Sequence, residues 1–139
     1  MVLLFMIIIS FNVNAQHAGV TVLNKGFGLD VGAVSNNVMM EIGLVFPLID
    51  LQNPNVYSLK GGYEIKFGDN FNFTPIIGAA LLKIRTWNYN DAVVVYKVIK
   101  PMYGIELGKD AHIGQGFITA KFIDKTIYYG LGMKVFFNK

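Results

Sequence analysis

Hydrophobic and polar positions alternate with a period of two along most of the chain after residue 16. The stretch VYSLKGGYEIKF, residues 56–67, shows the pattern most clearly. One face of this stretch carries large apolar side chains and the other carries small, polar or charged side chains. Such alternation is typical of a β-strand with two unlike faces, and no helical periodicity of comparable length follows it. The sequence therefore predicts an all-β protein.

Turn signals divide the alternating pattern into eight predicted strands. These cover residues 18–23, 27–34, 38–46, 56–67, 71–86, 92–108, 115–123 and 127–137. The segments between them are short and rich in turn-forming residues, such as Asn24-Lys25-Gly26, Ser35-Asn36-Asn37 and Gly68-Asp69-Asn70. Eight antiparallel strands that follow one another through short connections close into an up-and-down β-barrel. We expect one such barrel domain.

The composition of the two faces predicts which of them points outward. The apolar face carries Phe27, Leu29, Val31, Val38, Met40, Ile42, Leu44, Phe46, Tyr57, Leu59, Tyr63, Ile65, Phe67, Phe73, Ile77, Leu81, Tyr103, Ile105, Leu107, Ile118, Ala120, Phe122, Ile127, Tyr129, Leu131, Met133, Val135 and Phe137. This face is bulky and uncharged, so it would overfill the narrow lumen of an eight-stranded barrel. Against lipid it is favourable, whereas a Lys or Arg there costs about 2–4 kcal/mol at mid-depth. The sequence predicts a transmembrane barrel with the apolar face outside.

The polar face is then expected to fill the lumen. Glycine recurs on it in strand after strand, as a narrow interior requires. Its charged residues form a nearly balanced set, which suits a paired interior network. The predicted lumen charges are Asp30, Glu41, Lys60, Glu64, Lys66, Lys100, Glu106, Lys121 and Lys134.

Composition is consistent with a membrane barrel that is exported. Charged residues make up 15% of the chain, against about 25% in soluble domains, and the 53% hydrophobic residues are dispersed. Residues 1–15 are expected to be a cleavable signal peptide, because 2–9 are apolar and Val13-Asn14-Ala15 matches a small-residue cleavage site. Residues 16–139 then form the barrel. Cysteine is absent, which excludes disulfides and cysteine nucleophiles.

The C-terminal strand IYYGLGMKVFF, residues 127–137, and the eight amphipathic strands together resemble the small eight-stranded outer-membrane β-barrels of Gram-negative bacteria, the OmpX/OmpA-like family. The resemblance covers residues 17–137. It implies periplasmic termini, contact with outer-membrane lipid and lipopolysaccharide, and delivery to the outer-membrane assembly machinery. The implied assembly signature is Tyr129, Leu131, Met133, Val135 and Phe137, although Asn138 and Lys139 follow where the family usually ends on the aromatic residue.

The fifth and sixth strands exceed the roughly 9–11 residues that cross a bilayer. Six surplus residues at about 3.3 Å each would project about 20 Å beyond the membrane. The surplus carries Lys83, Arg85, Trp87 and Lys97, which we expect to contact lipopolysaccharide or the surroundings of the cell. Leu82, Ile84, Val94, Tyr96 and Val98 give the hairpin an apolar opposite face. The 82–98 hairpin either offers open edges to an extracellular protein strand or folds over the barrel mouth.

Catalysis, metal binding and cofactor binding are not expected. His17 and His112 both map to the periplasmic end as solvated side chains, and Ser35 lies in a turn. GFGLDVG, residues 26–32, fails the spacing of a dinucleotide loop. The predicted function is a non-catalytic structural or surface-interaction role in adhesion or in the cell envelope. Two alternatives remain: a soluble exported lipocalin-like barrel around an apolar ligand, and an acyl-transferring membrane enzyme.

Overall fold

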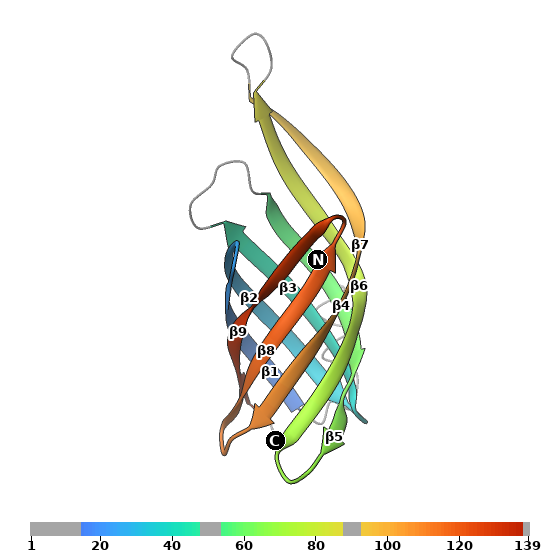
Figure 1. Cartoon of the computed structure of the whole chain (residues 1–139), viewed down its shortest axis with the longest axis vertical. Coiled ribbons are helices and arrows are strands. Elements are labelled where there is room, and N and C mark those ends of the chain that lie inside the picture. The colour runs from blue at the N-terminus through green and yellow to red at the C-terminus, as the bar shows by residue number, and fades with distance from the viewer. Residues whose placement is uncertain (1–14, 48–53, 88–92, 138–139) are drawn as a thin grey trace.

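The computed structural model describes residues 15–47, 54–87 and 93–137, which form one sheet of nine strands (Figure 1). No helix in these ranges is long and apolar enough to cross a membrane. The strands are β1 (Ala15–Leu23), β2 (Gly26–Ser35), β3 (Val38–Pro47), β4 (Asn55–Tyr63), β5 (Ile65–Phe67), β6 (Phe71–Trp87), β7 (Val93–Asp110), β8 (Gly114–Ile123) and β9 (Thr126–Phe136). The predicted strands therefore exist with shifts of a few residues at their ends, and β1 begins three residues earlier than predicted.

The sheet closes on itself as an antiparallel barrel. Consecutive strands pair with each other except β4 and β5, β1 pairs with β9, and β4 pairs with β6. Strands β4 and β5 together make one crossing, because Gly62 pairs with Ile76 and Ile65 pairs with Phe73 in the same continuous register. That register sets Pro75 opposite Tyr63, and proline has no N–H to complete the ladder there. The barrel thus has eight crossings, as the sequence predicts.

Two-residue turns join strands at both ends of the barrel, whereas the two longest connections, residues 48–54 after β3 and 88–92 after β6, both follow strands that run toward the same end. Asn36 and Asn37 have φ angles of 50° and 66°, and Gly68 has a φ of 62°. Two consecutive residues with positive φ are the signature of a type I′ hairpin turn, which asparagine tolerates. Outer-membrane barrels have short turns on the periplasmic side and longer loops outside. The end opposite to the two longest connections, which carries the turns at Asn36, Asn37 and Gly68, is therefore the periplasmic end.

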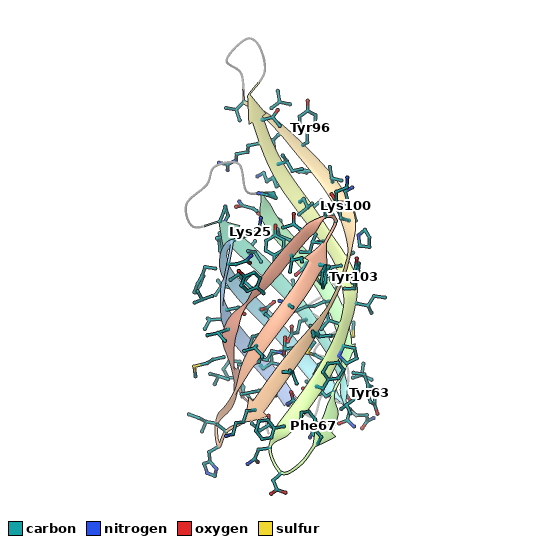
Figure 2. All side chains as sticks on the ribbon, viewed as in Figure 1. Lys25, Tyr63, Phe67, Tyr96, Lys100 and Tyr103 are labelled. Atoms are coloured by element: carbon teal, nitrogen blue, oxygen red, sulfur yellow. The ribbon has the colours of Figure 1, made fainter. Side chains whose placement is uncertain are left out.

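The apolar face points outward all around the barrel. None of the side chains predicted on that face is buried, and Ile77, Leu131 and Met133 are each more than half exposed. Figure 2 shows Tyr63 and Phe67 near the periplasmic end and Tyr103 higher on the wall. Tyr57 and Phe67 are ten residues apart on one crossing, so a strand tilt of about 40° separates them by about 25 Å in height. This matches the apolar band of an outer-membrane barrel, and the predicted orientation of the two faces is confirmed.

The interior contains an apolar layer that the sequence does not predict. Leu23, Val56, Met102 and Ile123 are buried on the inward face, where the pattern predicts polar residues, and Leu82 joins them from the apolar face predicted for the hairpin. Tyr128 belongs to the same cluster, and Ile84 packs against it. Most of these residues lie near the extracellular ends of their strands. We call these residues the apolar plug; they lie in the extracellular part of the lumen.

Strands β6 and β7 continue well beyond the other strands as a hairpin (Figure 1). Their pairing is unbroken from Phe71–Lys109 to Trp87–Val93. The barrel-side neighbours stop earlier, because β4 ends opposite Lys83 and β8 ends opposite Met102. The predicted projection is present, and Tyr96 lies on it above the barrel (Figure 2). The alternative in which the hairpin folds over the mouth is wrong.

Candidate functional site

A chain of ion pairs crosses the lumen below the apolar plug. Lys60 Nζ lies 2.9 Å from Asp30 Oδ1 and 2.5 Å from Glu41 Oε2. Lys134 Nζ lies 2.7 Å from Glu41 Oε1 and also pairs with Glu106. The order Asp30–Lys60–Glu41–Lys134–Glu106 alternates in sign and joins five strands. We call these five residues the lumen network, and it ties together walls that are not neighbours in the sheet.

Glu41 is the centre of the lumen network. Besides the two lysines, its Oε1 lies 2.7 Å from His17 Nε2, and both side chains are fully buried. The His17 ring also packs edge-on against Phe136. The interpretation of His17 as a solvated side chain is therefore wrong. His17 lies on the same face of β1 as the small inward residues Gly19 and Thr21, which indicates a position in the lumen. This signal is easily missed in the sequence, because hydrophobic and polar residues alternate only weakly in the first strand.

Because the lumen network is buried, its effect on the stability of the barrel depends on the pairing of every charge in it. A charge moved out of water loses several kcal/mol of hydration, and only well-placed opposite charges compensate for this loss. Lys134 has further contacts, since its Nζ lies 3.5 Å from Met39 Sδ and 4.9 Å from the centre of the Phe117 ring. Removing one partner of such a pair leaves an uncompensated charge, at a cost of about 3–5 kcal/mol. The network therefore contributes to stability only while it stays complete.

Glycines on neighbouring strands make the space for the buried charges. Lys60 lies opposite Gly78, Lys121 opposite Gly104, Lys134 opposite Gly19, Glu41 opposite Gly32, and Asp30 opposite Gly43. A Cβ added at Gly32 would come within 2.5 Å of Glu41 Cγ, and one added at Gly43 would come within 2.4 Å of Asp30 Oδ1. The glycine-rich polar face and the interior charges are thus two parts of one packing arrangement.

Most of the predicted lumen charges lie inside the barrel, and two do not. Asp30, Glu41, Lys60, Glu106, Lys121 and Lys134 are buried. Lys66 is exposed on the short β5 at the periplasmic rim, where it lines the opening of the lumen together with Glu64. Lys100 is partly exposed and lies 3.3 Å from Asp124, because β7 has passed the end of the barrel wall there. The assignment of Lys100 to the lumen is wrong, whereas Lys66 lines the periplasmic opening of the lumen.

The lumen opens toward the periplasm as a vestibule of about 390 Å³. Its lining includes Asn36, Asn37, Glu64, Asp110 and Gln115, and the Gln115 amide donates to Asp110 at 2.9 Å. Glu64 therefore lines the mouth of the lumen. Among the described residues, the vestibule, the lumen network and the apolar plug follow one another from the periplasmic end outward.

The protruding hairpin has an open backbone edge along β7. The Asp110 N–H donates to Asn70 O at 2.7 Å, so even-numbered residues of β7 direct their backbone groups toward β6. Odd-numbered residues direct theirs to the other side, where β8 pairs only with Met102–Asp110. The N–H groups of Val93, Val95, Lys97 and Ile99 consequently point to a side on which the described chain has no strand. Pro101, which has no N–H, stands where the pairing with β8 begins.

One face of the hairpin is basic. Lys83 lies directly opposite Lys97 in the register, and Arg85 follows two residues later on the same face. Lys97 and Arg85 are exposed. Like charges directly opposite one another destabilise a strand pair. The backbone of Trp87 ends β6, and its side chain lies outside the described structure. The apolar residues Leu82 and Ile84 of the other face connect the hairpin to the plug.

The residues of the predicted assembly signature lie on the lipid side of β9. Tyr129, Leu131, Met133, Val135 and Phe137 are all exposed. The Phe137 N–H donates to Gln16 O at 2.8 Å, which continues the pairing with β1 to the end of the described chain. Their role in assembly stays a prediction, as does the signal peptide, because residues 1–14, 138 and 139 lie outside the described residues.

Comparison with solved structures identifies the fold. The outer-membrane protein Ail of Yersinia pestis in a phospholipid bilayer nanodisc matches with a TM-score of 0.61 and 15% identity, over 89% of this chain and 99% of that chain. A designed transmembrane β-barrel matches with a TM-score of 0.60 and 14% identity, over 91% and 98%. The crystal structure of Ail, the attachment invasion locus protein, matches with a TM-score of 0.56 and 11% identity, over 91% and 99%.

No protein-family model and no curated protein matches the sequence. At the identities found, the structural likeness shows the fold alone, which is that of the small outer-membrane β-barrels that the sequence resembles. The predicted eight-stranded transmembrane barrel is therefore confirmed. The outward band consists of exposed apolar side chains. Together with this band, the fold indicates the outer membrane of a Gram-negative bacterium as the location.

Proposed function

We propose that this barrel is a non-catalytic surface-interaction protein whose β6–β7 hairpin docks an extended segment of an extracellular protein. The observation that carries the proposal is the open edge of β7 between Val93 and Pro101. An unpaired edge is a template for one more strand, because its N–H and C=O groups already point toward the position of that strand. Val93, Val95 and Ile99 are large and exposed on this segment, so apolar contacts would add to the hydrogen bonds.

The basic face gives the hairpin a second contact with the cell surface. Lys83, Arg85 and Lys97 rise just above the barrel, where the phosphates of lipopolysaccharide lie in an outer membrane. A phosphate between Lys83 and Lys97 would offset the repulsion of these two opposed ammonium groups. The basic face of the hairpin would thus bind lipopolysaccharide, while its β7 edge stays free to pair with a strand of the partner protein.

The interior gives no support to the lipocalin-like alternative. A lipocalin needs an apolar lumen that leaves a cavity for its ligand. Here the middle of the lumen holds the lumen network, and the apolar plug is packed with side chains. The bulky apolar residues face outward instead. The soluble ligand-binding barrel is therefore wrong, and adhesion or envelope attachment is the function that the surface features support.

Replacement of Val95 by proline tests the docking proposal. The Val95 N–H points to the open side, so proline removes a docking donor and leaves the bonds to β6 intact. Bacteria that lack other adhesins and display either the original protein or Val95→Pro would be compared for attachment to immobilised extracellular matrix. We expect the variant to lose attachment while it reaches the outer membrane normally.

Val95→Thr is the matched control, because threonine keeps the N–H and the β-branched shape. It should attach as the original protein does. Equal attachment by Val95→Pro contradicts docking by strand addition. Failure of the original protein to attach at all contradicts the proposed adhesive function.

A further inference from the structure

A depression lies on the outer wall of the barrel near its periplasmic end. It measures about 540 Å³ and is formed by outward residues of β6 to β9, among them Leu107, Ile118 and Leu131. Its cause is Gly116, an exposed residue of β8 that places no side chain between Lys109 on one side and Met133 on the other. A Cβ built at Gly116 would meet nothing within 4 Å. The depression is therefore a gap in an otherwise bulky lipid-facing surface.

The gap continues along β8 toward the middle of the membrane. A second, smaller depression of about 110 Å³ lies beside Ala120 and shares Leu107 and Ile118 with the first. We call the two depressions together the track. Tyr103 and Phe122 close the track at its upper end, since their rings stack with centres 5.4 Å apart. Gly116 and Phe122 are six residues apart, which is about 20 Å along the strand and about 15 Å in height at a tilt of about 40°. One leaflet of a hydrocarbon core about 30 Å thick has the same depth.

A single cation stands at the periplasmic mouth of this track. The Lys109 ammonium lies 5.4 Å from the centre of the Phe71 ring, and Phe71 stacks on Phe67 at 5.9 Å. Lys109 is exposed and makes no ion pair with the described residues. The chain reaches its periplasmic turn within two residues of Lys109, so the ammonium lies at the level of the lipid headgroups. The aromatic pair holds it beside the apolar track.

We infer that this track is a binding site for one anionic glycerophospholipid of the periplasmic leaflet. One acyl chain lies over Gly116 and Ala120 and ends at the Tyr103–Phe122 stack. The headgroup phosphate pairs with Lys109, whose charge no side chain of the described structure neutralises. A lipid with a net negative headgroup is favoured over a zwitterionic one, because an ammonium in the zwitterion would repel Lys109. The site lies on the opposite side of the membrane from the β6–β7 hairpin and does not depend on the docking proposal.

Native mass spectrometry of the purified barrel with a mixture of phosphatidylglycerol and phosphatidylcholine tests the inference. The original protein should retain one phosphatidylglycerol in preference to phosphatidylcholine. Lys109→Gln should lower that retention about fivefold, as expected for one lysine near an anionic lipid surface. Gly116→Ile should abolish it, because its side chain fills the depression. Neither change should harm folding, since both side chains point outward and isoleucine suits a strand better than glycine.

Two matched variants separate a site from the general lipid shell. Lys66→Gln removes another exposed lysine near the same rim, and Gly61→Ile fills an outward position of β4 where a Cβ would make only an ordinary contact with Met39 O at 3.6 Å. Both should retain the lipid as the original protein does. The inference is overturned if the original protein retains no phosphatidylglycerol, if Lys109→Gln and Gly116→Ile retain it unchanged, or if the matched variants lose it equally.

Discussion

At the level of single residues, Glu41 decides whether the interior charges stabilise the barrel. It contacts Lys60, Lys134 and His17, each from a different strand. Parity in the sequence predicts that Glu41 and the two lysines share the lumen. It does not predict the whole network, because Lys134 reaches Glu41 from a strand far away in the sequence, whereas Lys60 lies directly opposite Glu41 on the next strand. A similar limit explains why His17 is missed, since it reaches Glu41 from β1 across Gly32 of the intervening β2.

Replacement of Glu41 by glutamine should strongly destabilise the barrel. The change keeps the shape of the side chain but leaves Lys60 and Lys134 with one carboxylate fewer between them. We expect the free energy of unfolding to fall by about 3–5 kcal/mol. The temperature at which the folded band disappears on an unboiled gel measures the change.

Asp69→Asn, in the exposed turn before β6, removes a carboxylate without touching the lumen. It should change stability by no more than about 0.5 kcal/mol. If Glu41→Gln behaves like Asp69→Asn, the lumen network does not stabilise the barrel in the way described.

At the level of elements, the length of β6 and β7 determines which part of the protein projects beyond the barrel. The excess length of β6 and β7 is visible in the sequence, because the alternating pattern runs on past the length of a membrane crossing. The open side of β7 is not visible there, since it depends on where β8 ends. The break between β4 and β5 is hidden for a similar reason: its cause, Pro75, lies in the partner strand.

Replacement of Lys97 by glutamate should affect the hairpin and its lipopolysaccharide contact in opposite directions. Opposite Lys83, a glutamate converts a repulsive cross-strand pair into an attractive one, a gain of about 0.2–1 kcal/mol or more. Proteolytic cleavage of the hairpin should therefore slow. Retention of lipopolysaccharide during purification should fall by about fivefold or more, because a phosphate contact is lost.

Lys66→Glu makes the same change of charge at the periplasmic rim and should leave both quantities unchanged. A Lys97→Glu protein that retains lipopolysaccharide normally contradicts the assignment of the basic face to phosphate binding. A faster cleavage of the hairpin contradicts the repulsion between Lys83 and Lys97.

At the level of the whole molecule, the barrel combines a lipid-facing wall, an interior that holds the lumen network and the apolar plug, and a projecting hairpin. The wall follows from the sequence because the bulky, uncharged face recurs in every strand. The apolar plug does not, because Leu23, Val56 and Met102 share the inward parity with charged residues. Local alternation reports which face a residue occupies, whereas its height in the barrel depends on strand tilt and closure. Every functional feature described above depends on that closure.

Gel mobility of the protein, extracted in mild detergent from the outer-membrane fraction and run with and without boiling, tests the closed membrane barrel most directly. A closed barrel resists the detergent of the gel until it is heated, because all its backbone groups are paired between strands. We predict that the unboiled protein migrates differently from the boiled protein. A protein found in the soluble periplasmic fraction, with identical mobility before and after boiling, would contradict the account.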